Sequence, residues 1–313
     1  MIHAYALEPA VVASWGRREW FRFVHDKFGL GTARALLELP SFSKWKRAVY
    51  DAATKDQLSQ EDMKRVEELF RLFADHRCRR TDAVYDGLLT WLENAEREYD
   101  RKPFAAIVAT TNPRAHVAVI VGDTLGPTNV RWARPSGVTV ARKPEALATA
   151  LSAMLTNCRV LHLVDPHFGP ENSRHRRVLE AFMSVLASNG VVPEVVRVHT
   201  LAKSTLDFFE ASAREMAARL PSSIAVEFAR WEQRDGGDLI HNRYVLTDLG
   251  GVSLGVGIDA GRMGETDDLQ LLAPATYVLR WAQYVQNNGA LNAIDTPTAV
   301  RGLLRPALPR AKG

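Results

Sequence analysis

A histidine and an arginine two positions apart, His241 and Arg243, are the residues whose types and spacing best suit phosphate chemistry. Side chains two apart on an extended strand point to the same face, so both groups can address one phosphate. An imidazole supplies a nucleophile or a proton carrier near neutral pH, and a guanidinium binds phosphoryl oxygens through a fixed fork of donors. The pair predicts a phosphate-facing site; the alternative is a surface pair or a hydrogen-bonded core histidine.

A glycine-rich segment follows this pair. Gly255 and Gly257 permit tight backbone paths next to a bound group, because glycine has no β-carbon. Neither the Lys-Ser/Thr of a nucleotide-binding P-loop nor a dinucleotide-binding helix pattern follows them. His241 and Asp248 have neither the two-histidine helix spacing of zinc hydrolases nor a carboxylate-rich cluster suited to magnesium. We therefore expect neither a nucleotide cofactor nor a metal.

Asp165 directly follows the apolar run from Val160 to Val164, where the carboxyl end of a parallel strand would open into a crevice. As a functional residue it would orient His241 or His167. As a structural residue it would cap the turn at Pro166 with its own side chain. Both interpretations stay open at this point.

Basic residues begin the next predicted helix. Arg174 and Arg177 could bind a phosphate backbone, although a solvated charged face at a helix start is the interpretation that we favour.

Short β-branched runs alternate with helix-length segments after Pro103, which predicts a layered α/β domain over residues 104–300 with at least part of its sheet parallel. We expect strands at 105–109, 117–121, 138–141, 160–164, 191–198, 224–228, 244–247 and 252–254, and helices at 144–157, 174–189 and 205–220. We expect residues 301–313 to form a loosely ordered basic tail.

The first 103 residues show apolar positions at helical spacing until Pro103 stops the pattern, which predicts an all-helical N-terminal region. Between Trp15 and Arg47, eight Lys or Arg and three acidic residues are interleaved with large aromatic residues. This segment could hold a nucleic-acid backbone and stack bases. We favour a helical module with an aromatic core and a solvated basic face.

The bulk composition is that of an ordinary globular protein, with 46% hydrophobic and 24% charged residues. No apolar run approaches the roughly 20 residues that cross a bilayer, and the N-terminus lacks a signal-peptide pattern, so we expect a cytoplasmic protein. A net charge of +4 permits an anionic partner, and two distant cysteines predict no disulfide framework.

The string from His241 to Asp248, followed by Gly255-Val256-Gly257-Ile258-Asp259, resembles the phospholipase D signature HxKxxxxD and its glycine-rich segment. It is still more similar to the phospholipase D-like domain that follows MIT domains, in which His-x-Arg leads to Gly-x-Gly-x-Asp. The likeness runs from about Ala146 to Gly261. Arg243 replaces the usual lysine, Val256 the usual serine, and Ile258 or Asp259 the usual asparagine.

The resemblance implies a phospholipase D-like mixed sheet flanked by helices, after the helical N-terminal region. It also implies a phosphodiesterase-like protein acting on nucleic acid, such as a bacterial metal-independent nuclease or a nuclease-derived effector in defence against phage. In that mechanism His241 attacks phosphorus, Arg243 stabilises the oxygens, and Asp165 or Asp259 orients an imidazole. His167, Asp248, Gly255, Gly257, Arg174 and Arg177 would contact the substrate.

A second histidine must protonate the leaving oxygen, and the sequence has a single His-x-Arg unit. We therefore expect a homodimer that pairs two copies of His241, and less favourably a role for His167 of the same chain. One rival hypothesis is a non-catalytic module that binds phosphates of nucleic acid or of an anionic lipid. Another is a dimerising adaptor that recruits a protein partner through its helical N-terminal region.

Overall fold

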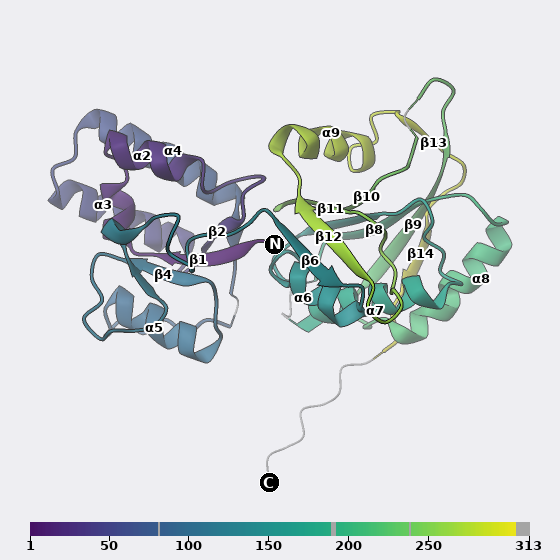
Figure 1. Cartoon of the computed structure of the whole chain (residues 1–313), viewed down its shortest axis with the longest axis horizontal. Helices are drawn as coiled ribbons and strands as arrows, with labels where there is room; N and C mark the ends of the chain where they lie inside the picture. The colour runs from purple at the N-terminus through teal and green to yellow at the C-terminus, as the bar shows by residue number, and fades with distance from the viewer. Residues whose placement is uncertain (81, 189–191, 238, 305–313) are drawn as a thin grey trace, which may run out of the picture. The chain divides into compact units, whose positions relative to one another are not determined.

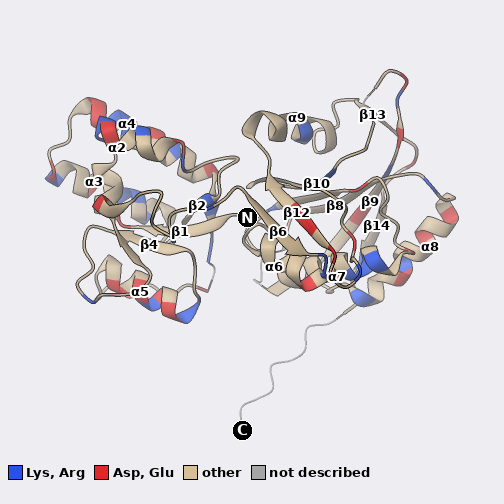
Figure 2. Cartoon of the chain, in the orientation of Figure 1, with Lys and Arg blue, Asp and Glu red and all other residues tan. Residues whose placement is uncertain are grey.

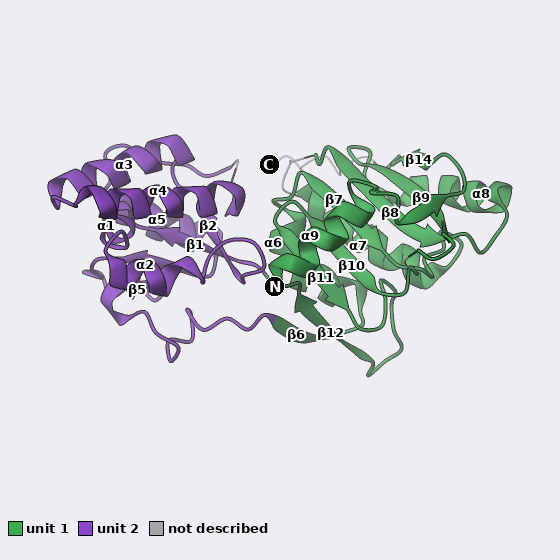
Figure 3. Ribbon diagram, turned by 90° about the horizontal axis from the view of Figure 1, so that it is seen from above, with its two compact units in different colours: residues 1, 137–313 green, residues 2–136 purple. Residues whose placement is uncertain are grey.

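The computed structural model describes residues 1–313 except 81, 189–191, 238 and 305–313, and the chain forms two compact units (Figure 1, Figure 3). Residues 2–136 form the N-terminal unit, and Met1 with residues 137–313 forms the C-terminal unit. Each unit has its own sheet.

The N-terminal unit is built on a five-stranded sheet in which every pair of neighbours is parallel. Its order, β3-β2-β1-β4-β5, is that of doubly wound α/β sheets. The strands are β1 (His3–Leu7), β2 (Arg34–Leu37), β3 (Arg77–Cys78), β4 (Ala106–Ala109) and β5 (Val119–Val121). The helices are α1 (Pro9–Ser14), α2 (Arg18–His25), α3 (Phe42–Lys55), α4 (Gln60–Asp75), α5 (Trp91–Arg101) and the short 3-10 turn η1 (Gly122–Thr124).

The expected N-terminal helices are present, but this region is not all-helical, because β1, β2 and β3 form the middle and one side of its sheet. These strands have five, four and two residues. In β2 the sequence Arg-Ala-Leu-Leu consists of strong helix formers, and all four residues are buried, which removes the alternation typical of a half-exposed strand. We expected β4 and β5 in the C-terminal domain, whereas they pair with β1. The predicted boundary at residue 103 thus falls inside the N-terminal unit, which ends at residue 136.

The aromatic residues between Trp15 and Arg47 belong to the core of this unit. Trp15, Phe28 and Trp45 are almost fully buried, and their neighbours Trp20, Phe21, Phe23 and Phe42 pack against the same core. Because their faces are covered by other side chains, the buried rings are not available to stack on bases.

The C-terminal unit contains a nine-stranded mixed sheet in the order β13-β9-β8-β7-β10-β11-β12-β6, with β14 also paired to β9. Its strands are β6 (Gly137–Ala141), β7 (Val160–Val164), β8 (Val195–Leu201), β9 (Ala225–Gln233), β10 (Arg243–Thr247), β11 (Gly250–Leu254), β12 (Thr266–Leu271), β13 (Leu291–Ala293) and β14 (Thr298–Arg301). Strands β7, β8 and β9 are parallel, and the other pairs are antiparallel. The prediction of an α/β domain with a partly parallel sheet is confirmed.

Helices cover both faces of this sheet (Figure 1). They are α6 (Pro144–Leu155), α7 (Ser173–Ser188), α8 (Leu206–Met216), α9 (Pro274–Tyr284) and the 3-10 turn η2 (Ala217–Arg219). On one face, Tyr284 of α9 packs against Tyr244 and His199, with ring centroids 6.3 and 5.5 Å apart. On the other face, Phe209 of α8 packs against Phe228 of β9 at 5.9 Å.

Two predictions reach residues outside the described part of the chain. The strand expected at 191–198 begins at Val195 in the structure, and residues 189–191 are not described. Most of the predicted basic tail, residues 305–313, is not described either. Its first residues belong to the C-terminal unit, because Arg301 ends β14 and the amide of Leu304 donates to the carbonyl of Leu220. Among the described helices, none combines the length and the apolar character that crossing a membrane requires.

Candidate functional site

One end of the C-terminal sheet collects the segments that carry the predicted site. Since β10 runs antiparallel to β7, with Tyr244 opposite Val164, the start of β10 lies beside the carboxyl end of β7. Arg243 is also paired with Leu254, so the loop after β11 leaves the sheet at the same end. We call this end, formed by the carboxyl ends of β7, β8 and β11 and the amino ends of β10 and β12, the site end.

Four basic or titratable side chains meet at the site end, and we call them the His-Lys-Arg cluster: His167, Lys203, His241 and Arg243. His167 follows β7, Lys203 follows β8, Arg243 begins β10, and His241 lies two residues before that strand rather than on it. The ammonium of Lys203 donates a hydrogen bond to Nδ1 of His167. Burial lowers the pKa of His167, and the charges of Lys203, Arg243 and His241 lower it further, while Asp165 opposes them. Three strand ends therefore bring these four groups within electrostatic reach of one another.

Arg243 is a half-buried cation without a carboxylate partner in the part of the chain that is described. Its Nη1 donates to the backbone carbonyl of His241 at 3.1 Å, and its buried Nε has no hydrogen-bond partner among the described residues. A buried donor left unpaired is costly, and an anionic oxygen would offset that cost.

Asp165 holds the backbone of the site end rather than an imidazole. It is 1% exposed, and its Oδ1 accepts from the amide of His167 while its Oδ2 accepts from the amide of Ile258, both at 2.8 Å. The carboxylate thus caps the turn after β7, which is the structural alternative, and ties that turn to the loop after β11. A β-carbon at Gly257 would lie 3.2 Å from Oδ2, so glycine allows this close approach.

Asp259 forms ion pairs with two arginines. Arg142 contacts its Oδ1, and Nη2 of Arg174 lies 2.8 Å from its Oδ2. Arg174 also donates from Nε to the carbonyl of Ala260 at 2.6 Å. Neither oxygen of Asp259 bonds to a histidine among the described contacts, so Arg174 and Asp259 shape the loop after β11.

Asp267 on β12 was not singled out by the sequence pattern. It is 3% exposed, and its Oδ1 accepts from the amides of Gly255 and Val256 at 2.9 and 3.1 Å. Together with Asp165 it fixes the glycine-rich loop by its backbone. The amide of Gly255 therefore bonds to the buried carboxylate of Asp267, and Gly257 lies close to the buried carboxylate of Asp165.

Asp248 lies at the opposite end of β10 from the His-Lys-Arg cluster. Its Oδ1 accepts from the amide of Arg159 at 2.8 Å, and its Oδ2 from Nε of the same residue at 3.2 Å. It lies five positions along the chain from Arg243, roughly 16 Å at the usual rise of a strand. Its role is to fasten the start of β7.

Arg177 of α7 lines a pocket of about 590 Å³ in the C-terminal unit. Arg142, Lys143 and Arg219 line the same pocket, together with Glu180, which lies 3.6 Å from Arg219. Figure 2 shows basic residues on α7, the helix that contributes Arg177. Ala260 and Gly261 form part of its wall, so it adjoins the loop after β11.

A second pair of histidines lies on the face of the sheet that α9 covers. Nδ1 of His162 is 2.8 Å from Nε2 of His199, and the indole of Trp231 donates to Nδ1 of His199 at 3.0 Å. Burial lowers the pKa of His162 to about 4, and burial also lowers the pKa of His199 well below its usual value. Both rings are neutral near pH 7, and they are part of the core.

The described residues contain no group of three or more His, Cys, Asp or Glu side chains that could hold a metal ion. The cluster itself offers two imidazoles and two cations, a donor set suited to an anion.

No protein-family model matches the chain, and no curated protein matches it by sequence. Among solved structures, the chain is similar to Nuc, a phospholipase D family member from Salmonella typhimurium, with 8% identity and a TM-score of 0.34 over 52% of this chain and 100% of that one. It is also similar to TrmBL2, an archaeal chromatin protein that binds DNA, with 12% identity and a TM-score of 0.28. That match covers 51% of this chain and 56% of TrmBL2. Both likenesses are weak.

Proposed function

We propose that the C-terminal unit is a phosphodiesterase of phospholipase D type that acts on nucleic acid without a metal. The observation that carries this proposal is the His-Lys-Arg cluster, in which two imidazoles and two cations from three strand ends meet at the site end. Cations alone would suffice to bind a phosphate, whereas a pair of histidines also supplies a nucleophile and a proton carrier.

In the first step, an imidazole nitrogen of His241 attacks phosphorus, and a nitrogen–phosphorus bond forms as the bond to the leaving oxygen breaks. Arg243 stabilises the phosphoryl oxygens with its fork of donors. His167 gives the proton on its Nε2 to the leaving oxygen and takes a proton from Lys203 at Nδ1. In the second step, the hydroxyl of a water molecule displaces His241 from phosphorus. The remaining proton goes to Nε2 of His167, and Nδ1 returns its proton to Lys203.

This arrangement uses two histidines of one chain. The homodimer that the single His-x-Arg unit predicts is then not required for chemistry, although it stays a prediction about assembly. Asp165 acts as a positioning residue, because it holds the backbone of His167 and of the loop after β11.

Nucleic acid is the substrate class that the charge favours. The chain carries a net charge of +4, and the pocket next to the loop after β11 is lined by four cations and two acids. A nucleic-acid strand that is bound at the His-Lys-Arg cluster and extends to this pocket could place further phosphates beside Lys143, Arg177 and Arg219. A metal-independent nuclease of this kind would suit a bacterial effector in defence or repair, and neighbouring defence genes would support that role.

A non-catalytic phosphate-binding module is the second candidate, and one observation favours it. No carboxylate accepts a hydrogen bond from either imidazole of the cluster among the described residues, so neither ring is oriented as in a typical acid–base pair. Such a module would bind phosphates of nucleic acid or of anionic lipid headgroups. A dimerising adaptor is the third candidate.

The test is binding and cleavage of single-stranded and double-stranded DNA and RNA by the full chain in the presence of a chelator. We expect cleavage by the wild type, and its loss in His241→Asn and His167→Asn with binding retained. Arg243→Ala should weaken binding and cleavage together. His25→Asn is the matched control, since its side chain is 39% exposed on α2 of the other unit.

Binding without cleavage under any condition, unchanged by His241→Asn, would establish the binding module instead. Cleavage that was lost in the presence of the chelator would instead indicate a metal held by acidic residues. If neither nucleic acid nor anionic lipid vesicles bound at low salt, the adaptor would remain.

A further inference from the structure

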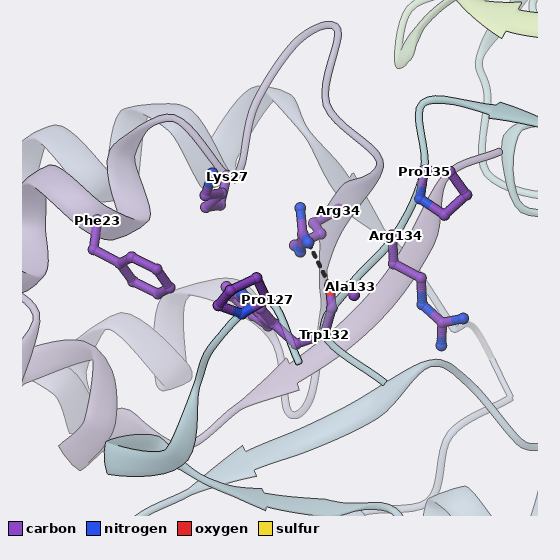
Figure 4. Close-up of a pocket in the computed structure, with 8 residues that line it drawn as sticks. All are labelled: Phe23, Lys27, Arg34, Pro127, Trp132, Ala133, Arg134 and Pro135. Carbon is purple, nitrogen blue, oxygen red and sulfur yellow. Dashed lines mark hydrogen bonds between the residues drawn. The ribbon is translucent and has the colours of Figure 1, made fainter. Parts of the chain in front are cut away.

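The N-terminal unit contains its own pocket, of about 630 Å³, which the proposed chemistry does not use. Its wall comes from the end of α2, the first residue of β2 and the segment before residue 136. The lining residues are Phe23, Lys27, Arg34, Pro127, Trp132, Ala133, Arg134 and Pro135 (Figure 4). Three of the eight are cations, and none is acidic.

Arg34 is the most unusual of these residues, because a guanidinium that is only 8% exposed has no carboxylate partner among the described residues. One Nη donates to the carbonyl of Trp132, and the buried Nε has no hydrogen-bond partner there. Figure 4 shows the guanidinium between Lys27 and the backbone carbonyl of Trp132. A buried charge without a counter-ion is costly, so an anion in the pocket would stabilise this arrangement.

The other charges around the pocket have the same sign. Lys27 and Arg134 form no ion pair in the described part of the chain, although Nε of Arg134 donates to the hydroxyl of Tyr5 at 3.3 Å. Burial lowers the pKa of His3 to about 4, and the charges of the N-terminal ammonium, Arg134 and Arg34 add to this effect. The region therefore has a positive potential, which favours a ligand with more than one negative charge.

The remaining walls are apolar. Phe23 stacks on Trp132 with centroids 6.2 Å apart, and Arg34 lies 4.5 Å from the centroid of the same indole. With Trp132 covered in this way, Phe23, Pro127 and Pro135 are the surfaces left for a flat apolar group. The volume lies in the usual range of small-molecule sites, about 300–1,000 Å³.

We propose that this pocket binds a small phosphate ester with a flat apolar body, of the nucleoside monophosphate type, through Arg34 and Lys27. The site lies where β2 begins, at the amino end of the parallel sheet. Doubly wound sheets usually bind ligands at the carboxyl ends of their strands. At that end of this sheet Glu8 accepts hydrogen bonds from the amide and hydroxyl of Thr110, at 2.6 and 2.8 Å.

The test is calorimetric titration of the full chain with 5′-AMP, adenosine and inorganic phosphate. We expect 5′-AMP to bind more tightly than inorganic phosphate, inorganic phosphate to compete with it, and adenosine not to bind. Lys27→Gln and Arg34→Gln should each weaken 5′-AMP about tenfold, the usual effect of losing one charge-assisted hydrogen bond. Lys64→Gln, an exposed lysine on α4, is the control in the same unit.

Arg243→Ala separates this pocket from the His-Lys-Arg cluster, because the 5′-AMP binding that depends on Lys27 should persist in this variant. Binding lost in Arg243→Ala, or unchanged in Lys27→Gln, would overturn the proposal. So would equal affinities for adenosine and 5′-AMP, or for inorganic phosphate and 5′-AMP. Arg34→Gln could unfold the unit, but Lys27 is only half-buried, so its variant keeps the test valid.

Discussion

The ammonium of Lys203 donates a hydrogen bond to Nδ1 of His167, and the two residues follow the neighbouring parallel strands β8 and β7. Because Nδ1 accepts this bond, neutral His167 carries its proton on Nε2. Nε2, the ring nitrogen that Lys203 does not contact, can therefore donate a proton, and Lys203 can replace that proton through Nδ1.

Removing this lysine should raise the pKa of His167. In Lys203→Met a nearby positive charge no longer disfavours the imidazolium, so the pKa should move up towards its usual value. Titration of the His167 ring signals by NMR measures the shift. Lys143→Met removes a cation that is not among the causes of the lowering, and it should leave the His167 titration unchanged. A His167 pKa that stays the same without Lys203 would contradict the contact.

Nucleic-acid affinity should fall about tenfold in Arg243→Ala, and less in Arg177→Ala, which removes a contact of the adjoining pocket. Each loss of a phosphate contact should also make the dependence of affinity on salt less steep. Fluorescence anisotropy over a series of salt concentrations measures both effects. Arg159→Ala is the control, because this 59% exposed arginine lies at the opposite end of β10. An equal loss in the control would indicate non-specific attraction.

Asp165→Ala should lower the free energy of unfolding by about 2–4 kcal/mol, because it leaves the buried amide of Ile258 and the partly buried amide of His167 without their acceptor. Asp165→Asn keeps one side-chain oxygen and should cost less. Urea unfolding of both variants measures the difference. Asp207→Ala, exposed at the start of α8, should stay within about 0.5 kcal/mol of the wild type. If Asp165→Ala were equally mild, the carboxylate would not hold the loop.

The buried histidine pair predicts a loss of stability in mild acid. The pKa of His162 is about 4 in the folded chain against 6.5 when unfolded, so the unfolded chain binds the extra proton between these values. Stability from this group is present above pH 6.5 and falls as the pH drops towards 4. At about pH 5 the loss amounts to about 2 kcal/mol for His162.

His162→Gln keeps an acceptor for His199 and removes the titrating group. Its free energy of unfolding should therefore change less between about pH 7.5 and about pH 5 than that of the wild type. Urea unfolding at both pH values provides the comparison, and His25→Gln, on a 39% exposed side chain, should behave like the wild type. An unchanged pH dependence in His162→Gln would show that His162 titrates normally.

If His167 is the second histidine, specific activity should not depend on dilution, whether or not the chain dimerises. Light scattering determines the assembly state over the range of concentrations used for the assay. Activity that fell in proportion to the loss of a dimer would instead support two copies of His241 in one cleft.

Much of the C-terminal fold could be predicted from its sequence, because β-branched runs such as that of β7 alternate with segments of helix length. The N-terminal sheet could not, since β1 to β3 are short and β2 is made of helix formers. Strand β12, with the sequence Thr-Asp-Asp-Leu-Gln-Leu, was not predicted either, because an aspartate such as Asp267 is usually exposed whereas here it is buried.

The candidate site was predictable where a residue pattern carried it, as for His241 with Arg243 and for Asp165 at a strand end. Lys203 lies two residues after β8, and the strand-end argument missed it because the predicted strand ended at 198 whereas β8 ends at Leu201. The position of Asp248 could be predicted only from the length of β10, because a residue five positions after the start of this strand lies at its opposite end.

The antiparallel insertion of β10 beside β7 has a consequence for synthesis on the ribosome. About eighty residues separate the two strands along the chain, so their pairing is a slow, non-local step. A nascent or truncated chain that ends before residue 241 carries His167 and Lys203 but neither His241 nor Arg243. The N-terminal unit, whose residues emerge first, can fold while the cluster is still incomplete. Any activity at the cluster would then begin only once Arg243 has been made and β10 has paired with β7.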